Sequence, residues 1–166
     1  DAATALAIYC GGTEEGFVQL MNDKARLLGL EGTHFSNPHG LDAPDHYSNA
    51  KDLGILASYA LRNPIFSMTV ATKSVRIGER SLITHNKLLW RVNGTNGVKT
   101  GFTKAAGRIL VSGAKRMNRQ LICVTINAPD DWNDHTFLLD QGFARYKIKP
   151  LVEENQTLGV IDVIGG

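Results

Sequence analysis

The sequence predicts an α+β fold in which an antiparallel sheet is flanked by helices. Helix-type periodicity occurs in three stretches within residues 1–61, strand patterns and tight turns lie within residues 72–127, and a final helical pattern covers residues 131–146. Helices before and after a run of antiparallel strands are typical of this class. The 166 residues, 43% of them hydrophobic, are enough to bury the core of one domain.

Three helices are expected in the N-terminal part. The first covers residues 1–9, which are rich in alanine, and a glycine pair ends it. The second begins at Thr13, a residue type that caps helices, and stops at Gly29. The third covers residues 49–61 and ends before an Asn-Pro pair. The apolar residues expected to face inward from the second and third helices are Phe17, Leu20, Met21, Leu27, Leu28, Leu53, Leu56, Ala57 and Ala60.

A long loop, residues 30–47, joins the second and third helices, and loops of this length in compact domains are often functional. The loop carries His34, His39 and His46, but their spacings match no standard zinc arrangement and no nucleophile pairs with them. We therefore expect these histidines to pack and hydrogen-bond within the loop, and we predict no metal site.

The second half of the chain has the pattern of a sheet. Residues 72–84 predict one hairpin, residues 93–97 a turn that leads into a strand containing Lys99, and residues 107–127 a second hairpin. The final helix, residues 131–146, is expected to turn Phe137, Leu138, Phe143 and Tyr146 inward. Residues 158–166 alternate like a strand that continues into another structure.

The charge balance argues against nucleic acid as a partner, and the cysteine content predicts the state of the thiols. The 18 basic and 16 acidic residues, taken as mixed along the chain, give a net charge of +2 and predict no nucleic-acid partner. No apolar run reaches membrane-spanning length. Cys10 and Cys123 have apolar neighbours, so we expect two buried free thiols, with a disulfide as the alternative.

The segment Gly97-Val98-Lys99-Thr100-Gly101-Phe102-Thr103 carries the clearest chemistry. Lys99 offers a positive charge and three N–H donors, Thr100 and Thr103 offer hydroxyls that we expect on one face of a strand, and Gly101 lets another backbone approach. This combination suits an anionic peptide terminus. Lys-Thr-Gly is also one of three active-site motifs of serine penicillin-recognising enzymes, together with Ser-x-x-Lys and a Ser-x-Asn element.

Four ordered blocks connect this motif to a known family. Residues 33–42, 48–53 and 86–90, followed by the Lys99 motif, resemble the D-alanyl-D-alanine carboxypeptidases, which are low-molecular-mass penicillin-binding proteins of peptidase family S11. The resemblance covers the whole chain. It implies the fold shared by serine β-lactamases and penicillin-binding transpeptidases, an extracytoplasmic location in the cell envelope, and a peptidoglycan stem peptide or a β-lactam as ligand.

The resemblance also assigns roles to single residues. Lys99 gives electrostatic help near the nucleophilic serine and the substrate carboxylate, Thr100 and Thr103 bind that carboxylate, and Gly101 lets the substrate backbone align with the strand. Phe102 supplies its backbone N–H to the oxyanion hole, and His39 borders the site. The family's acyl transfer to a serine needs no metal and no organic cofactor.

One departure from the family pattern is important. Family members carry the serine, its lysine and the Ser-x-Asn element before the position matched by Asp1, so we expect an incomplete catalytic domain at residues 1–150. Residues 151–166 are expected to begin a connection to a β-rich C-terminal domain and membrane anchor. By itself the chain should be inactive, and it is expected to form homodimers. A β-lactamase fragment and a catalytically dead, cell-wall-binding or structural homologue are the alternatives.

Two Ser-x-x-Lys spacings lie inside the chain. Ser48 and Lys51 fit a helix start, where a lysine one turn away can take the proton of a serine, but an N-cap formed by Ser48 or Asn49 is the favoured interpretation. In the second, Ser112 and Lys115 point to opposite faces of a strand and are set aside. Arg108 is expected to be an exposed strand residue rather than part of the site.

Overall fold

The structure is a computed structural model and describes residues 1–149, 151–152 and 155–159. The order of elements is α1 (Ala2–Gly11), α2 (Glu14–Leu27), α3 (Ala50–Ala60), α4 (Pro64–Ala71), β1 (Ser74–Ile77), β2 (Arg80–Ile83), α5 (Leu88–Arg91), β3 (Thr95–Thr103), β4 (Gly107–Arg116), β5 (Arg119–Ile126) and α6 (Asp131–Arg145). The fold is α+β, as predicted. Within the described part of the chain, no helix combines the length and hydropathy needed to cross a membrane.

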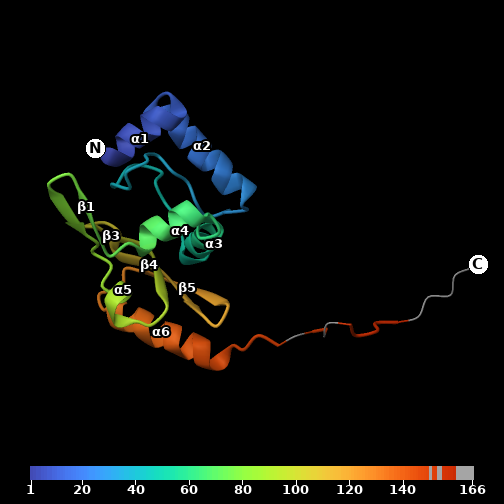
Figure 1. Cartoon of the computed structure of the whole chain (residues 1–166). Helices are drawn as coiled ribbons and strands as arrows, with labels where there is room; N and C mark the ends of the chain where they lie inside the picture. Colours follow the sequence, from blue (N-terminus) through green and yellow to red (C-terminus); the bar gives the residue numbers. More distant parts are fainter. Residues whose placement is uncertain (150, 153–154, 160–166) are drawn as a thin grey trace, which may run out of the picture.

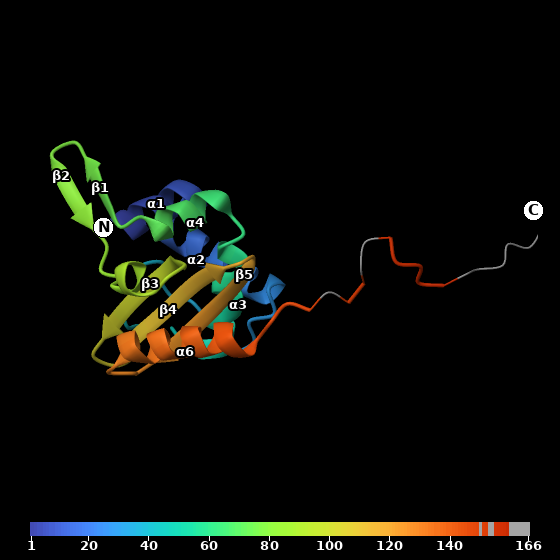
Figure 2. The same ribbon diagram turned by 60° about the horizontal axis from the view of Figure 1, so that its bottom comes forward.

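A three-stranded antiparallel sheet with the order β3-β4-β5 forms the centre of the molecule. Helix α6 packs against β4 and β5, and α5 packs against β3 and α6 (Figure 1). Helix α3 contacts β4 and β5, and α4 contacts β3 (Figure 2). The hairpin β1–β2 forms a separate two-stranded sheet, which projects from the body in both views.

The three expected helices begin and end close to the predicted residues because local capping interactions fix their ends. The Thr13 hydroxyl accepts a hydrogen bond from the backbone N–H of Gly16 at 2.9 Å, and Gly12 ends α1 with a φ of 77°. Asn49, and not Ser48, caps α3, since its side-chain oxygen accepts from the N–H of Asp52 at 2.9 Å. The capping interpretation of this segment is therefore confirmed, with Asn49 as the cap.

Two short helices, α4 and α5, were not expected from the sequence. Asn63 caps α4 by accepting from the N–H groups of Ile65 and Phe66, and Pro64 occupies the first turn, where its missing N–H costs nothing. The Asn-Pro pair was interpreted only as the end of the preceding helix, although it also starts the next one. Helix α5 has four residues, too few for a periodic pattern.

The inward face predicted for α6 is largely wrong. Phe137, Leu138 and Tyr146 are 63%, 48% and 71% exposed, and of the predicted set Phe143 alone is buried. The buried face runs through Asp131, His135, Leu139 and Phe143, one helical turn apart. Two of these residues are polar, so an apolar pattern cannot reveal the face. They are buried because partners on β4 and β5 satisfy them.

The core joins α5, β4 and α6. It consists of Leu88, Val92, Leu110, Ala114, Leu139 and Phe143, with Leu121, Cys123 and Trp132 packed against it. Both cysteines are free, as expected, but Cys10 is exposed and the prediction that it is buried is wrong. The strand expected at residues 158–166 lies mostly outside the described residues, and the domain boundary near residue 150 stays a prediction.

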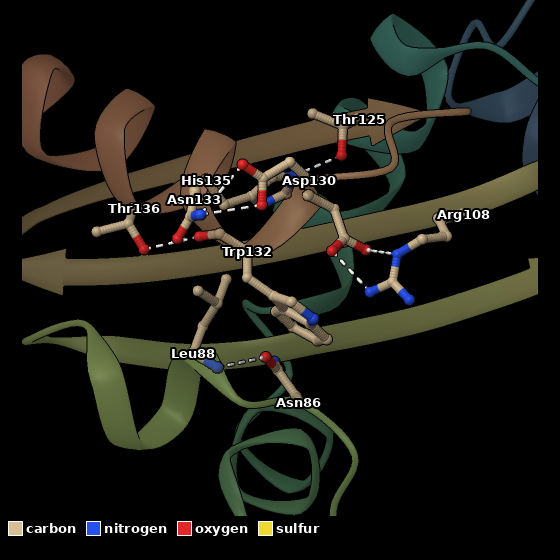
Figure 3. A network of polar contacts seen from close by, with 10 residues as sticks. Asn86, Leu88, Arg108, Thr125, Asp130, Trp132, Asn133, His135 and Thr136 are labelled. Atoms are coloured by element: carbon tan, nitrogen blue, oxygen red, sulfur yellow. Dashed lines mark hydrogen bonds and ion pairs between the residues drawn. The ribbon is translucent and has the colours of Figure 1, made fainter.

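A polar network beside this core links α6 to the sheet (Figure 3). The imidazole of fully buried His135 lies between two hydroxyls, with Nδ1 2.6 Å from Ser112 Oγ and Nε2 2.9 Å from Thr125 Oγ1. Nearby, Arg108 donates two hydrogen bonds to the carboxylate of buried Asp131, at 3.1 and 2.7 Å. Arg108 is therefore not simply an exposed strand residue, because it is paired with α6.

The buried His135 makes stability depend on pH. Burial lowers its pKa to about 4 despite the opposing charge of Asp131, whereas an unfolded imidazole titrates near 6.5. Because the unfolded chain binds the proton more readily, the free energy of unfolding should fall as the pH drops from 6.5 to 4, by up to about 3 kcal/mol. Urea denaturation across this range measures the effect.

Two variants isolate the contribution of His135. The pH dependence between 4 and 6.5 should be reduced in His135→Gln, which is also less stable at neutral pH because one buried hydroxyl loses its partner. The matched control, His85→Gln, alters an exposed imidazole and should retain the wild-type profile. Equal pH profiles for His135→Gln and the wild type would contradict the assignment.

The two thiols should differ in reactivity. Burial, together with the nearby Asp134 carboxylate, raises the pKa of Cys123 to about 11, so very little thiolate is present at neutral pH. Exposed Cys10 should be alkylated by iodoacetamide first, with one equivalent bound to the folded chain and two to the unfolded chain. Mass analysis of Cys10→Ser, which should remain unmodified when folded, checks which thiol has reacted.

Candidate functional site

An apolar cavity of about 950 Å³ lies between α2, α3, α4 and the sheet. Its walls include residues from the predicted inward faces of the second and third helices: Phe17, Leu20, Met21, Leu53, Leu56, Ala57 and Ala60. Leu27, at 79% exposure, was wrongly assigned to this set. All five residues of the predicted binding motif, Lys99 to Thr103, also line the cavity. The structure thus places the motif in the wall of this apolar cavity.

The motif lies on β3, an edge strand of the described sheet. Lys99 pairs with Val111 and Gly101 with Ile109 in the register with β4. Because side chains alternate along a strand, Lys99, Gly101 and Thr103 share one face, and Thr100 lies on the other with Phe102. The expectation that Thr100 and Thr103 present their hydroxyls on the same face is therefore wrong. Residues three apart in a strand point in opposite directions.

Lys99 is an exposed cation at the edge of the cavity. Its ammonium donates to the backbone carbonyl of Thr100, which leaves two of its three N–H donors. None of the ion pairs found among the described residues involves Lys99. The charge can therefore pair with an anionic ligand.

Gly101 has no packing reason to be a glycine. A Cβ built there would lie 3.7 Å from Ile109 Cβ, which is an ordinary van der Waals contact. By contrast, Gly107 in the following turn has a φ of 70°, and a Cβ would meet Asn127 Oδ1 at 2.2 Å. The side chain missing at Gly101 leaves the strand surface open, while Gly107 is required by the fold itself.

Thr103 has a local role as well as a place on the cavity wall. Its hydroxyl oxygen accepts a hydrogen bond from the N–H of Ala106 at 3.0 Å and so stabilises the turn between β3 and β4. The hydroxyl proton remains available to a ligand. Phe102, 69% exposed, also borders the cavity.

The loop between α2 and α3 forms another side of the cavity and is held by Asp52. The Asp52 carboxylate, 3% exposed, accepts from the N–H of Gly32 and from the hydroxyl of Thr33, both at 2.8 Å. The Thr33 hydroxyl in turn lies 2.8 Å from Ser48 Oγ. This role of Asp52 was not expected from the sequence, although an acidic residue in the first turn of a helix after a polar loop is the signal that points to it.

The loop histidines behave as structural residues. His39 Nε2 lies 3.7 Å from Glu14 Oε1, and its neighbour Gly40 lines the cavity, so His39 itself stays a predicted border residue. His46 Nδ1 accepts from the N–H of Ser36, and burial lowers the pKa of His46, with His39 and His34 acting in the same direction. No group of side chains within the described ranges could hold a metal ion.

Neither serine of the two Ser-x-x-Lys spacings is an activated nucleophile in this structure. Ser48 Oγ contacts Thr33, and the side chain of Lys51 is exposed, so the two do not form a catalytic pair. Ser112 does contact an imidazole, that of His135, but both residues are fully buried. A substrate therefore cannot reach this pair. Lys115, the lysine of the same Ser-x-x-Lys spacing, is exposed whereas Ser112 is buried, as expected for opposite faces of a strand.

Comparison with curated proteins gives consistent relatives. The chain is 37% identical to the D-alanyl-D-alanine carboxypeptidase DacF of Bacillus subtilis, over all of this chain and 45% of that protein. It is 36% identical to DacC of Escherichia coli, over 90% of this chain and 40% of that protein. The chain therefore spans less than half the length of these two relatives.

Solved structures share the fold. A mutant of the Streptomyces K15 DD-transpeptidase superposes with a TM-score of 0.83 and 31% identity, over 86% of this chain and 62% of that one. Penicillin-binding protein 5 of Haemophilus influenzae superposes with a TM-score of 0.78 and 34% identity, over 85% of this chain and 43% of that one. The family model described as peptidase S11, D-alanyl-D-alanine carboxypeptidase, matches residues 1–130. With its motif, fold and relatives in agreement, the chain belongs to the D-alanyl-D-alanine carboxypeptidase family.

Proposed function

We propose that this chain is the carboxylate-binding part of a serine-type D-alanyl-D-alanine carboxypeptidase, which removes the terminal D-alanine from peptidoglycan stem peptides outside the cytoplasm. The observation that carries the proposal is Lys99, a cation on an edge strand at the rim of the apolar cavity, which forms no ion pair with any residue that the structure describes. A carboxylate is the natural counter-charge for such a site. The names of the relatives support the same reaction class.

The motif residues take separate roles in this proposal. Lys99 and Thr103, on one face of β3, bind the terminal carboxylate, and Thr100 contributes its hydroxyl from the strand edge. The substrate backbone adds alongside β3 over the open surface at Gly101, as extended peptides do at sheet edges. Phe102 gives its backbone N–H to the oxyanion hole.

The chemical step is acyl transfer to a serine. The serine oxygen bonds to the penultimate carbonyl carbon, the peptide bond to the terminal D-alanine breaks, and water later hydrolyses the ester. The attacking serine and its proton acceptor are supplied by parts of the longer protein outside this chain, and no cofactor enters the reaction. β-Lactams acylate the same serine in this proposal. The C-terminal membrane anchor and the cell-envelope location are further proposals from the family. A homodimer of this chain is a separate proposal, based on the apolar surface that the rest of the longer protein would cover.

Removing the charge of Lys99 tests the assignment. In a full-length protein that contains this chain, Lys99→Ala should lower kcat/KM for release of D-alanine from diacetyl-lysyl-D-alanyl-D-alanine by about 30-fold or more, equivalent to about 2 kcal/mol. Lys99→Arg should recover only part of the loss, because a planar guanidinium cannot replace the compact ammonium. The matched control is Lys104→Ala, an exposed lysine outside the cavity wall, which should keep wild-type activity.

The isolated chain should form no covalent penicillin adduct. Its motif supplies binding and electrostatic stabilisation, whereas acylation needs a serine activated by a base. Incubation with a fluorescent penicillin followed by intact-mass analysis should detect an adduct on the full-length protein and none on residues 1–166. A stoichiometric adduct at Ser48 of the isolated chain would show that our map of the active site is wrong.

A further inference from the structure

The charges of this chain are segregated, not mixed as the near-neutral total suggests. Residues 53–129 contain twelve lysines and arginines and a single acidic residue, Glu79. The other fifteen carboxylates lie before or after this segment. On the α6 side, Arg108 and Arg116 pair with Asp131 and Asp140. These two arginines are neutralised, and the excess of positive charge lies on the other basic residues of the segment.

The hairpin β1–β2 and its continuation into α5 carry a large part of this excess. Five basic residues occur between residues 73 and 91, namely Lys73, Arg76, Arg80, Lys87 and Arg91. Glu79 is the one acidic residue among them, which gives this segment a net charge of +4. No ion pair found among the described residues neutralises any of the five.

The same hairpin exposes apolar side chains. All eight residues of β1 and β2 are exposed, including Val75 at 45%, Ile77 at 63%, Leu82 at 50% and Ile83 at 68%. The two strands pair with each other and with no other described strand (Figure 2). An isolated two-stranded hairpin is at best marginally stable in water, so a projecting hairpin with four bare aliphatic side chains is suited to a surface that covers them.

An exposed tryptophan lies at the base of the hairpin. Trp90 on α5 is 51% exposed, and the ammonium of Lys73, the residue before β1, lies 5.9 Å from the centre of its ring. Tryptophan is enriched at membrane interfaces, since the indole combines an apolar body with a polar N–H, and lysine is a further interfacial anchor. The aliphatic residues, the cations and the tryptophan therefore belong to one continuous segment.

We propose that residues 73–91 form a membrane-contact element, which places the hairpin on a bilayer surface that contains anionic lipids. The aliphatic side chains of the hairpin and the Trp90 indole enter the boundary between headgroups and acyl chains, while the basic side chains stay at the level of the headgroups. Each lysine or arginine near an anionic surface favours binding through its charge. The proposal goes beyond the proposed peptidase function and does not depend on it.

The composition favours a membrane over a soluble polyanion. A polyanion in solution requires cations alone and gives no reason for exposed Val75, Ile77, Leu82 and Ile83 beside them. A purely apolar protein partner, conversely, gives no reason for a net charge of +4. A bilayer with anionic headgroups satisfies both features at once.

Vesicle binding by the 166-residue chain tests the proposal without any substrate. The wild type should co-sediment with vesicles of phosphatidylcholine and phosphatidylglycerol, and much less with phosphatidylcholine alone. Trp90 emission should shift to the blue on binding, and the shift should disappear in Trp90→Phe, which distinguishes it from Trp132. An unchanged emission spectrum at vesicle concentrations that bind the chain would overturn the proposed insertion.

Matched double variants separate the two contributions. Arg76→Gln/Arg80→Gln and Ile77→Ser/Ile83→Ser should each weaken partitioning by about tenfold or more. The controls Lys51→Gln/Lys147→Gln and Leu27→Ser/Leu41→Ser remove the same number of positive charges or aliphatic side chains at exposed positions elsewhere and should bind like the wild type. All substituted side chains are exposed, and unchanged thermal midpoints confirm folding.

Two outcomes would contradict the proposal. One is equal vesicle binding by the hairpin variants and their controls. The other is a loss confined to the charge variant, accompanied by equally tight binding of the wild type to dextran sulfate in the absence of lipid, which would instead indicate a site for a soluble polyanion.

Discussion

The burial of β4 on both faces is the constraint on which the rest of the structure depends. Leu110, Ser112 and Ala114 are fully buried against α6 and its neighbours, while Val111 on the opposite face lines the cavity. A strand enclosed in this way cannot slip by one residue without moving apolar side chains into water and polar ones into the core. Since β3 takes its register from β4, the position of Lys99 at the cavity is fixed by packing on the far side of the sheet.

Side-chain hydrogen bonds reinforce the register of the three strands in addition to the apolar packing. The side-chain amides of Asn96 on β3 and Gln120 on β5 bond to each other across β4, at 2.9 and 3.3 Å. They pass over Gly113, where a Cβ would lie 2.8 Å from Asn96 Oδ1. On the other face, His135 connects β4 to β5 through Ser112 and Thr125. The outer strands are thus joined across the central one by side chains as well as by the backbone ladder.

Local chemistry made much of the fold predictable from the sequence. Caps such as Thr13 and turns such as Met117-Asn118, both with positive φ, act within a few residues, so the helices and hairpins could be located. The sequence likewise identified the motif at Lys99 to Thr103 and the family of the chain. The buried face of α6 could not be, because the burial of Asp131 and His135 depends on partners 10 to 23 residues away in sequence. The exposure of Cys10 depends on which elements pack over it, which residue type does not reveal. The faces of Thr100 and Thr103, by contrast, follow from side-chain alternation along a strand and could have been predicted.

The open surface at Gly101 shows that a glycine can be needed for a reason other than folding. At Gly107 and Gly113 an added methyl group collides with the chain's own atoms, so replacing either glycine impairs folding. At Gly101 the methyl group meets no atom of the described residues closer than 3.7 Å, so the fold should tolerate it. Under the proposed function, the cost of that methyl group arises only when a peptide occupies the strand edge. A survey that ranks substitutions by expression or thermal stability will therefore overlook Gly101, and growth under a β-lactam is the kind of selection that will reveal it.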